Sequence, residues 1–150
     1  MVQLASRERM FIEACRIGHL ATSDGEGAPS VVPVCFALDG DTLYTAIDEK
    51  PKGKRPLARL RNIASRSAVA IVFDHYDEDW TRLGWVLIRG DAEILLEGPE
   101  AERATALLRA RYAQYDGMVL SPIIAIRMAR IVSWGDLAAS RHTGDACASG

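Results

Sequence analysis

The sequence predicts a mainly β fold of the α+β class, in which about six antiparallel strands form a barrel covered by helices. Three observations predict it: segments of strand length recur along the chain, turn residues join most of them as hairpins, and three segments show helical spacing of apolar residues. The 150 residues are 49% hydrophobic, which suffices for a single core. We therefore expect one domain over residues 1–137 and a flexible tail over residues 138–150.

The predicted strands cover residues 19–23, 30–38, 42–47, 68–73, 85–97 and 123–134. Pro33 cannot donate to a ladder, so the second strand lies at an edge, or meets a bulge or a bound group there. The turn at 39–41 joins this strand to the third as a hairpin. The continuous apolar run 68–73 predicts a central strand with both faces covered. Gly90 predicts a bend or bulge in the fifth strand. In the last strand, alternation places five side chains on one side: Ile124, Ile126, Met128, Val132 and Trp134.

Helical spacing predicts three helices. Ser6 is a candidate N-cap of the first, which ends before Gly18. The second runs from Pro56 to Ala64, with proline at its favoured first position. The third begins at Pro99 and presents one apolar face: Ala101, Ala104, Leu108, Tyr112 and Tyr115.

The composition of the chain argues against several classes of protein. The net charge is −2, which argues against a dedicated nucleic-acid binder. The three cysteines are far apart and fit neither a disulfide framework nor a zinc cluster, and no apolar run is long enough to span a bilayer. The first residues lack the zones of a signal peptide. We therefore expect a cytoplasmic protein with no membrane partner.

Positive charge is concentrated between Lys50 and Arg61, where six cations fall within twelve residues. On the second helix, Leu57, Leu60 and Ala64 share one face, whereas Arg55, Arg59 and Asn62 share another. Lys50, Lys52 and Lys54 lie in the loop that leads to the helix N-terminus, where free N–H groups favour anions. Tyr44 and Thr45, just upstream, add hydrogen-bonding groups. The pattern supports two interpretations equally: a site for a phosphate or carboxylate, and a solvated basic loop.

Other candidate sites are less specific. The segment "DHYDED" at 74–79 lacks the ligand spacing of a cation loop and predicts a solvated connection, or a lid whose neighbours Trp80 and Trp85 cover an aromatic ring. His19 has no partner residue at a metal-ligand spacing, so we expect a structural role and no metal site. No serine lies in a G-x-S-x-G elbow, which argues against a serine hydrolase.

The order of motifs resembles a known family. "GHLAT", "SVVPVCF", "LYT", a lysine-rich loop, "RLRNI" and "WVLIRGDAEIL" are similar to the pyridoxamine 5′-phosphate oxidase-like proteins, whose fold is the FMN-binding-type split β-barrel. "DEKPK", "LARLRNI" and "DHYDEDWTRLGWV" most resemble the branch of probable users of the deazaflavin coenzyme F420.

This resemblance implies a homodimer with the cofactor in a groove between the subunits. By position, the implied cofactor-binding residues are Ser30, Val32, Val34, Tyr44 and Thr45 along the ring or its tail, and Lys50, Lys52, Arg59 and Asn62 at the phosphate, with Lys54 and Arg55 beside them. Trp85, next to the predicted lid, is a further candidate over the ring, with a core or dimer contact as the alternative. The family's flavin-using oxidases carry R-x-x-x-x-K in the second strand, where Ser30 and Cys35 stand here. This departure favours F420 over FMN.

The resemblance further implies an F420-dependent oxidoreductase that transfers a hydride between the deazaflavin and a small unsaturated or aromatic substrate. The alternatives are an FMN-dependent oxidase or reductase of the same fold, and a non-catalytic cofactor or tetrapyrrole-binding protein. Tyr44 and His75 are the candidate proton donors.

Overall fold

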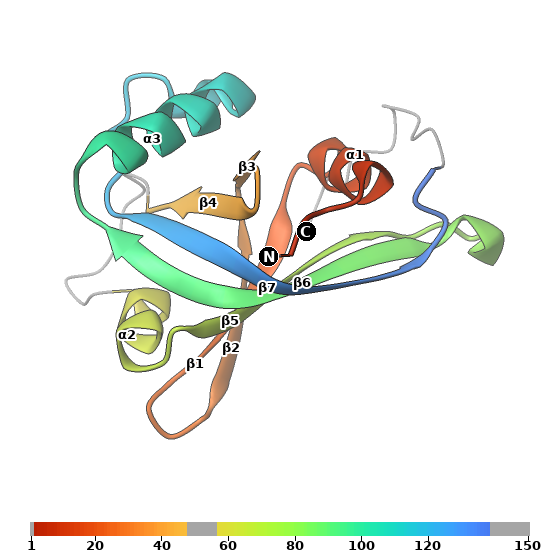
Figure 1. Ribbon diagram of the computed structural model, residues 1–150, viewed down its shortest axis with the longest axis horizontal. Coiled ribbons are helices and arrows are strands. Elements are labelled where there is room, and N and C mark those ends of the chain that lie inside the picture. Colours follow the sequence, from red (N-terminus) through yellow and green to blue (C-terminus); the bar gives the residue numbers. More distant parts are fainter. Residues whose placement is uncertain (1, 48–56, 139–150) are drawn as a thin grey trace.

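The computed structural model describes residues 2–47 and 57–138 (Figure 1). In chain order its elements are α1 (Ser6–Ala14), β1 (Gly18–Ser23), β2 (Pro29–Val34), β3 (Ala37–Asp39), β4 (Thr42–Ala46), α2 (Ala58–Ser65), β5 (Ala68–His75), the 3₁₀ turn η1 (Trp80–Arg82), β6 (Gly84–Leu95), α3 (Pro99–Arg111), the 3₁₀ turn η2 (Ala113–Tyr115) and β7 (Ile123–Gly135).

The described strands form one curled antiparallel sheet of seven strands, in the order β2-β1-β5-β6-β7-β4-β3. This is the half-barrel of a split barrel, with three α-helices around it (Figure 1). The predicted fold class is therefore confirmed, with one strand more than expected. The extra strand arises because the predicted strand 30–38 is interrupted at Cys35 and Phe36 and forms β2 and β3.

Two apolar cores hold the helices on the sheet. The first lies inside the curl and includes Phe36 and Phe73, whose ring centroids are 4.7 Å apart. The second lies between α3 and the β3–β4 hairpin, where Ala104 and Leu108 are fully buried. Figure 1 shows α3 on one side of the sheet and α2 on the other.

A β-bulge in the longest strand pair corrects the prediction for the last strand. Gly90 pairs with Met128 whereas Arg89 pairs with Arg130, so Ala129 is an extra residue in β7. Because of this extra residue, the side chains of β7 after Ala129 point to the opposite face from the one that simple alternation predicts. Ile124, Ile126 and Met128 are buried as expected, but Val132 and Trp134 are 36% and 53% exposed on the opposite face.

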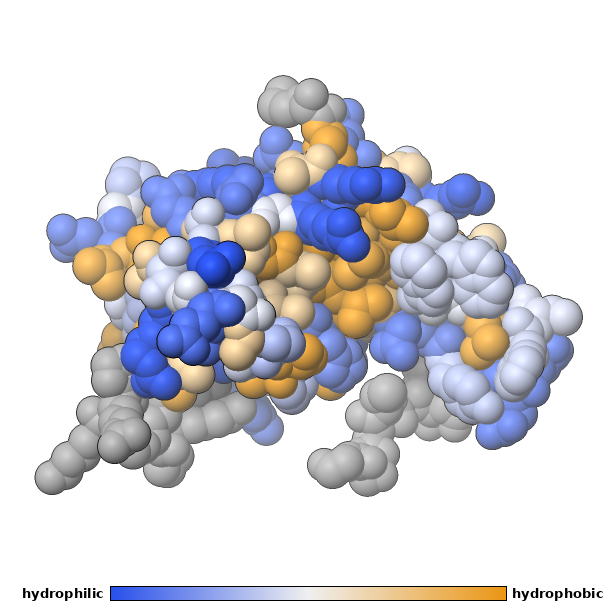
Figure 2. Space-filling view, turned by 90° about the horizontal axis from the view of Figure 1, so that it is seen from below, coloured by the Kyte–Doolittle hydropathy of each residue, from blue (hydrophilic) through white to orange (hydrophobic). Residues whose placement is uncertain are grey.

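The outer face of the sheet is partly apolar; α3 covers it at β3, β4 and the start of β7, but none of the described helices packs on it at β5, most of β6 or the end of β7. β5 alternates between buried and half-buried positions, so it is central as predicted but only one of its faces is buried. Val31 on β2 is 63% exposed, and Trp85 pairs with Trp134. Figure 2 shows apolar residues gathered in the middle of the underside of the molecule.

The ends of two helices also differ from the predictions. Ser6 is the first residue of α1 and not its cap, because the N–H of Ala5 donates to Glu8 Oε1 at 2.9 Å. In α2 the buried residues are Asn62 and Ile63, whereas Ala64 is exposed. Its predicted start, Pro56, lies outside the described residues, as does the chain beyond residue 138.

Candidate functional site

The candidate site is a pocket at the seam of the split barrel. β2 and β3 follow one another in the chain but form the two opposite edges of the sheet, so the sheet must curl to bring them together. At this seam lies a pocket of about 310 Å³. Its lining residues come from five parts of the chain: Ile17, Pro33, Val34, Cys35, Thr45, Ala46, Arg59 and Tyr115.

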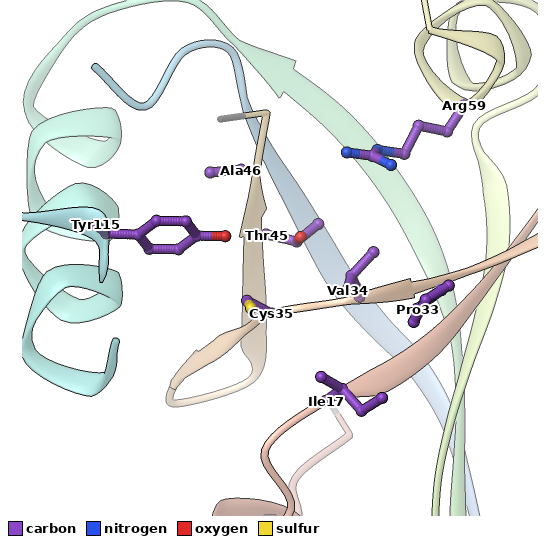
Figure 3. A pocket seen from close by; sticks show the side chains of 8 residues that line it. All are labelled: Ile17, Pro33, Val34, Cys35, Thr45, Ala46, Arg59 and Tyr115. Carbon is purple, nitrogen blue, oxygen red and sulfur yellow. The ribbon is translucent and has the colours of Figure 1, made fainter. Parts of the chain in front are cut away.

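Polar groups from three elements converge on this pocket. Thr45 on β4 is 1% exposed, Tyr115 in η2 is 6% exposed, and Arg59 on α2 is half-buried. Figure 3 shows the Tyr115 hydroxyl and the Arg59 guanidinium pointing into the same space from opposite sides, with Thr45 between them. The side chains of Pro33, Val34 and Ile17 line another part of the wall (Figure 3). The pocket thus offers a cation and hydroxyls beside an apolar surface.

A hydrogen-bonded clamp fixes the backbone around the pocket. The hydroxyl of Tyr112 accepts from the N–H of Phe36 at 3.1 Å and donates to the carbonyl oxygen of Arg16 at 2.9 Å. Arg111 donates to the carbonyl oxygen of Cys15 at 2.9 Å, and its guanidinium lies 4.7 Å from the centroid of the Phe36 ring. These contacts hold the residues that precede Ile17 and follow Cys35.

The structure brings three of the predicted cofactor-binding residues together in the pocket: Val34, Thr45 and Arg59. Ser30 and Val32 share a face of β2 with Val34, but Ser30 is exposed and Val32 packs against the first core. Trp85 lies on the outer face of β6, opposite Trp134. Lys50, Lys52, Lys54 and Arg55 lie outside the described residues.

Asn62 has a different environment from the one expected. Its side chain is 6% exposed, and Nδ2 donates to Thr22 Oγ1 on β1 at 3.0 Å. It therefore joins α2 to the sheet and does not line the pocket into which Arg59 points.

Tyr44 is not among the lining residues of the pocket. Its hydroxyl donates to Glu100 Oε1 at 2.8 Å within the second core. Burial, followed by the bond to Glu100, raises the pKa of Tyr44 to about 12. The other candidate donor, His75, ends β5, and its Nε2 lies 3.9 Å from Asp77 Oδ2.

Sequence reasoning missed five of the pocket residues: Ile17, Pro33, Cys35, Ala46 and Tyr115. For Pro33 there was a signal, since a proline in a strand indicates an open edge or a bound group. For Tyr115 there was none, because the helical pattern assigned it to the face of α3, whereas it belongs to η2. A second hollow, of about 360 Å³, is lined by Gln3, Leu4, Arg9, Gly40 and Asp41 and contains no predicted site residue.

Within the described ranges, no group of three or more His, Cys, Asp or Glu residues could hold a metal ion. No helix in the same ranges is long and apolar enough to cross a membrane.

The fold places this chain among the split β-barrel proteins, and comparisons with known proteins agree with this fold class. The model of the pyridoxamine 5′-phosphate oxidase family matches residues 5–135. The chain therefore belongs to this family. A search of curated proteins found no match.

Solved structures share the fold at low sequence identity. A conserved hypothetical protein from Mycobacterium tuberculosis is 19% identical with a TM-score of 0.69, over 97% of this chain and 94% of that one. An FAD-binding protein from Mesorhizobium loti is 20% identical with a TM-score of 0.64, over 88% and 95%. The heme storage protein HutZ from Vibrio cholerae is 15% identical with a TM-score of 0.64, over 87% and 94%.

Proposed function

We propose that this protein is an oxidoreductase that binds coenzyme F420 at the seam pocket and transfers a hydride between the deazaflavin and a small unsaturated or aromatic compound. The observation that carries the proposal is the guanidinium of Arg59, which faces the same space as the Thr45 hydroxyl while Pro33 and Val34 line an apolar wall. A guanidinium is suited to phosphate recognition, and an apolar wall to a flat ring.

The residues of the pocket fit part of such a cofactor. A volume of about 310 Å³ is at the lower end for ligand pockets, so the pocket holds the phosphate end or the ring and not the whole molecule. In this proposal Arg59 binds the phosphate, and the hydroxyls of Thr45 and Tyr115 orient the bound group. When bound, the deazaflavin supplies the hydride chemistry, and the protein contributes position and electrostatic environment.

The choice of F420 over FMN rests on strand β2. Its residues Pro29–Val34 include no lysine or arginine, so cations for the phosphate come from α2 and from the basic segment before it. FMN on the same fold is the alternative, and the FAD-binding structural neighbour is consistent with a flavin.

Separate titrations of the purified protein with F420 and with FMN test the proposal, with cofactor fluorescence as the readout. We expect F420 to bind more tightly than FMN. Arg59→Ala should weaken F420 binding about 10- to 100-fold, since a hydrogen bond to a charged group is worth about 1.5–3 kcal/mol. Arg61→Ala is the matched control, because Arg61 is an exposed residue of the same helix outside the pocket lining.

Tight binding of FMN without binding of F420 would replace the proposal by the alternative. Equal losses in Arg59→Ala and Arg61→Ala would refute the role of Arg59. A heme titration tests the non-catalytic alternative. The described residues that line the pocket include no histidine, so we expect no spectrum of histidine-ligated heme.

We also propose that a second copy of the chain completes the groove by packing on the outer face of the sheet. Val31, Val132 and Trp134 are exposed on this face, and burial of such a surface favours association. Sedimentation should give twice the 16.4 kDa chain mass. Trp134→Lys should shift the protein toward monomer, whereas Leu96→Lys, at a 73% exposed residue just beyond β6, should not. A wild-type monomer at all concentrations would refute the dimer.

A further inference from the structure

The seam pocket contains a thiol that the proposed function does not use. Cys35 lies in the connection between β2 and β3, is half-buried, and lines the pocket. The other free cysteine of the described chain, Cys15, is 8% exposed, and its thiol contacts the carbonyl oxygen of Phe11 at 3.5 Å. The two thiols therefore differ in access, and only that of Cys35 borders a pocket.

A second, independent feature shows that this pocket is built for a polar ligand. Thr45 is 1% exposed, yet its hydroxyl takes part in none of the hydrogen bonds found among the described residues. Figure 3 shows this side chain facing the space between Tyr115 and Arg59. A hydroxyl at a pocket wall that makes no hydrogen bond within the protein can donate to an oxygen acceptor of a ligand.

The charge of the pocket specifies the sign of that ligand. Arg59 directs its guanidinium into the pocket, and the other described residues of the lining carry no carboxylate. A guanidinium and a hydroxyl that face one space match a carboxylate, which accepts hydrogen bonds from both. The apolar wall of Pro33 and Val34 accommodates the rest of a small ligand.

Hydrogen bonds also fix the backbone next to Cys35. The Tyr112 hydroxyl accepts from the N–H of Phe36, the residue after Cys35, and donates to the carbonyl oxygen of Arg16, the residue before Ile17. The backbone of Cys35 is therefore fixed relative to the opposite rim of the pocket.

We propose that Cys35 is a modification site at which a small anionic disulfide forms a mixed disulfide with the protein, guided by Arg59 and Thr45. The Cys35 thiolate attacks one sulfur of the reagent, the reagent's S–S bond breaks as the new S–S bond forms, and the released half leaves as a thiolate. The proton of the thiol passes to solvent. A reducing thiol reverses the reaction by the same exchange. The bound half fills the pocket; that it also excludes the cofactor rests on the proposed function.

The test uses the full chain with Cys147→Ser, because Cys147 lies outside the described residues. Two probes are compared: 5,5′-dithiobis(2-nitrobenzoate), a dianionic aromatic disulfide, and 2,2′-dithiodipyridine, a neutral one. Absorbance of the released thiol gives the rate, and peptide mass spectrometry locates the adduct. We expect the dianionic probe to modify Cys35 ahead of Cys15.

The variant Arg59→Gln isolates the guidance by charge. We expect it to slow the dianionic probe about tenfold, as the loss of one close charge–charge contact predicts. The neutral probe should keep its rate within about twofold, and it also reports whether the pocket of the variant is intact. Arg61→Gln, which removes the same charge from an exposed position of α2, should change neither rate.

Three results would overturn the proposal: no adduct on Cys35 in the folded protein, equal modification of Cys15, or an Arg59→Gln effect that is the same for both probes. Protection of Cys35 by added F420 is a separate measurement. If F420 gives no protection while the Arg59 dependence persists, the proposed cofactor site is wrong and the modification site stands.

Discussion

Replacement of Tyr44 by phenylalanine gives a quantitative test of how α3 is attached to the barrel. Tyr44 is 3% exposed, and its hydroxyl donates to Glu100 in the first turn of α3. Arg127 on β7 donates to both oxygens of the same carboxylate and, at 2.8 Å, to Glu93 on β6. The phenol therefore links β4 to an ion-paired carboxylate between α3 and β7.

The expected loss follows from the type of bond. A hydrogen bond to a charged acceptor contributes about 1.5–3 kcal/mol to the free energy of unfolding. The side chain of Glu100 is 39% exposed and remains paired with Arg127, so solvent screening lowers the expected loss for Tyr44→Phe to about 1–2 kcal/mol. Urea denaturation at neutral pH measures it, and Tyr76→Phe is the control because Tyr76 is 62% exposed.

The pH dependence provides a second check. The pKa of Tyr44 is raised to about 12 from an ordinary value of 10.0, mainly by burial and also by the bond to Glu100. A raised pKa in the folded state means that the stabilisation is complete below pH 10 and is lost as the pH rises toward 12. The difference between wild type and Tyr44→Phe should therefore shrink across this window.

Hydrogen bonds from Arg127 and then Tyr44 lower the pKa of Glu100 to about 2 from 4.5. This contribution is present above pH 4.5 and is lost as the pH falls toward 2. An unchanged free energy of unfolding in Tyr44→Phe at neutral pH, or a difference that persists undiminished to pH 12, would refute the reasoning.

Two further predictions concern the sheet. Gly90→Ala should destabilise the protein by about 3 kcal/mol or more in urea denaturation, because its Cβ would lie 2.3 Å from the carbonyl oxygen of Arg127. Gly25→Ala, where the nearest atom is 4.0 Å away, should change stability by less than about 1 kcal/mol; similar losses at both sites would contradict the close approach. Asn62→Ala should cost about 1–3 kcal/mol, because it leaves the buried Thr22 hydroxyl without its donor. Adding Thr22→Val should recover part of this loss in the same assay, and a purely additive double variant would show that the bond is unimportant.

Much of the fold could be predicted because its signals are local. The strand after Gly18, the central strand β5 and an irregularity at Gly90 each follow from a short stretch of residues, and each is found where the pattern predicts it. The bulge at Ala129 could not be predicted, because alternation in β7 continues through it and only the register with β6 reveals the extra residue. That one residue moved Val132 and Trp134 to the outer face.

The candidate site was predictable only in part, for a related reason. The sequence indicated Arg59 and Thr45 because they belong to a continuous basic and polar stretch of the chain. It did not indicate the hydrogen bond of Asn62 to Thr22, forty residues earlier. Cys35 and Tyr115 are eighty residues apart in sequence and meet because α3 and η2 pack against the β3–β4 hairpin.

The composition of β2 explains why the barrel remains open at this seam. β2 pairs with β1 along one edge, and among the described strands its other edge has no partner. Proline is tolerated in a paired strand only where the missing N–H would point away from the partner, so both Pro29 and Pro33 lie at positions that face the open edge.

The backbone positions of Pro29, Val31 and Pro33 alternate with those that bond to β1, so all three face the open edge. Proline has no N–H, and Val31 is therefore the single N–H donor among these three positions. A strand edge with one N–H donor in three positions pairs poorly with a further strand, which is consistent with the absence of backbone pairing between β2 and β3 among the described strands. The space left by the missing ladder is lined by side chains, and Arg59 and Thr45 supply the polar groups there that the backbone of β2 does not. The prolines that disfavour closure are therefore a structural reason for a pocket at this position.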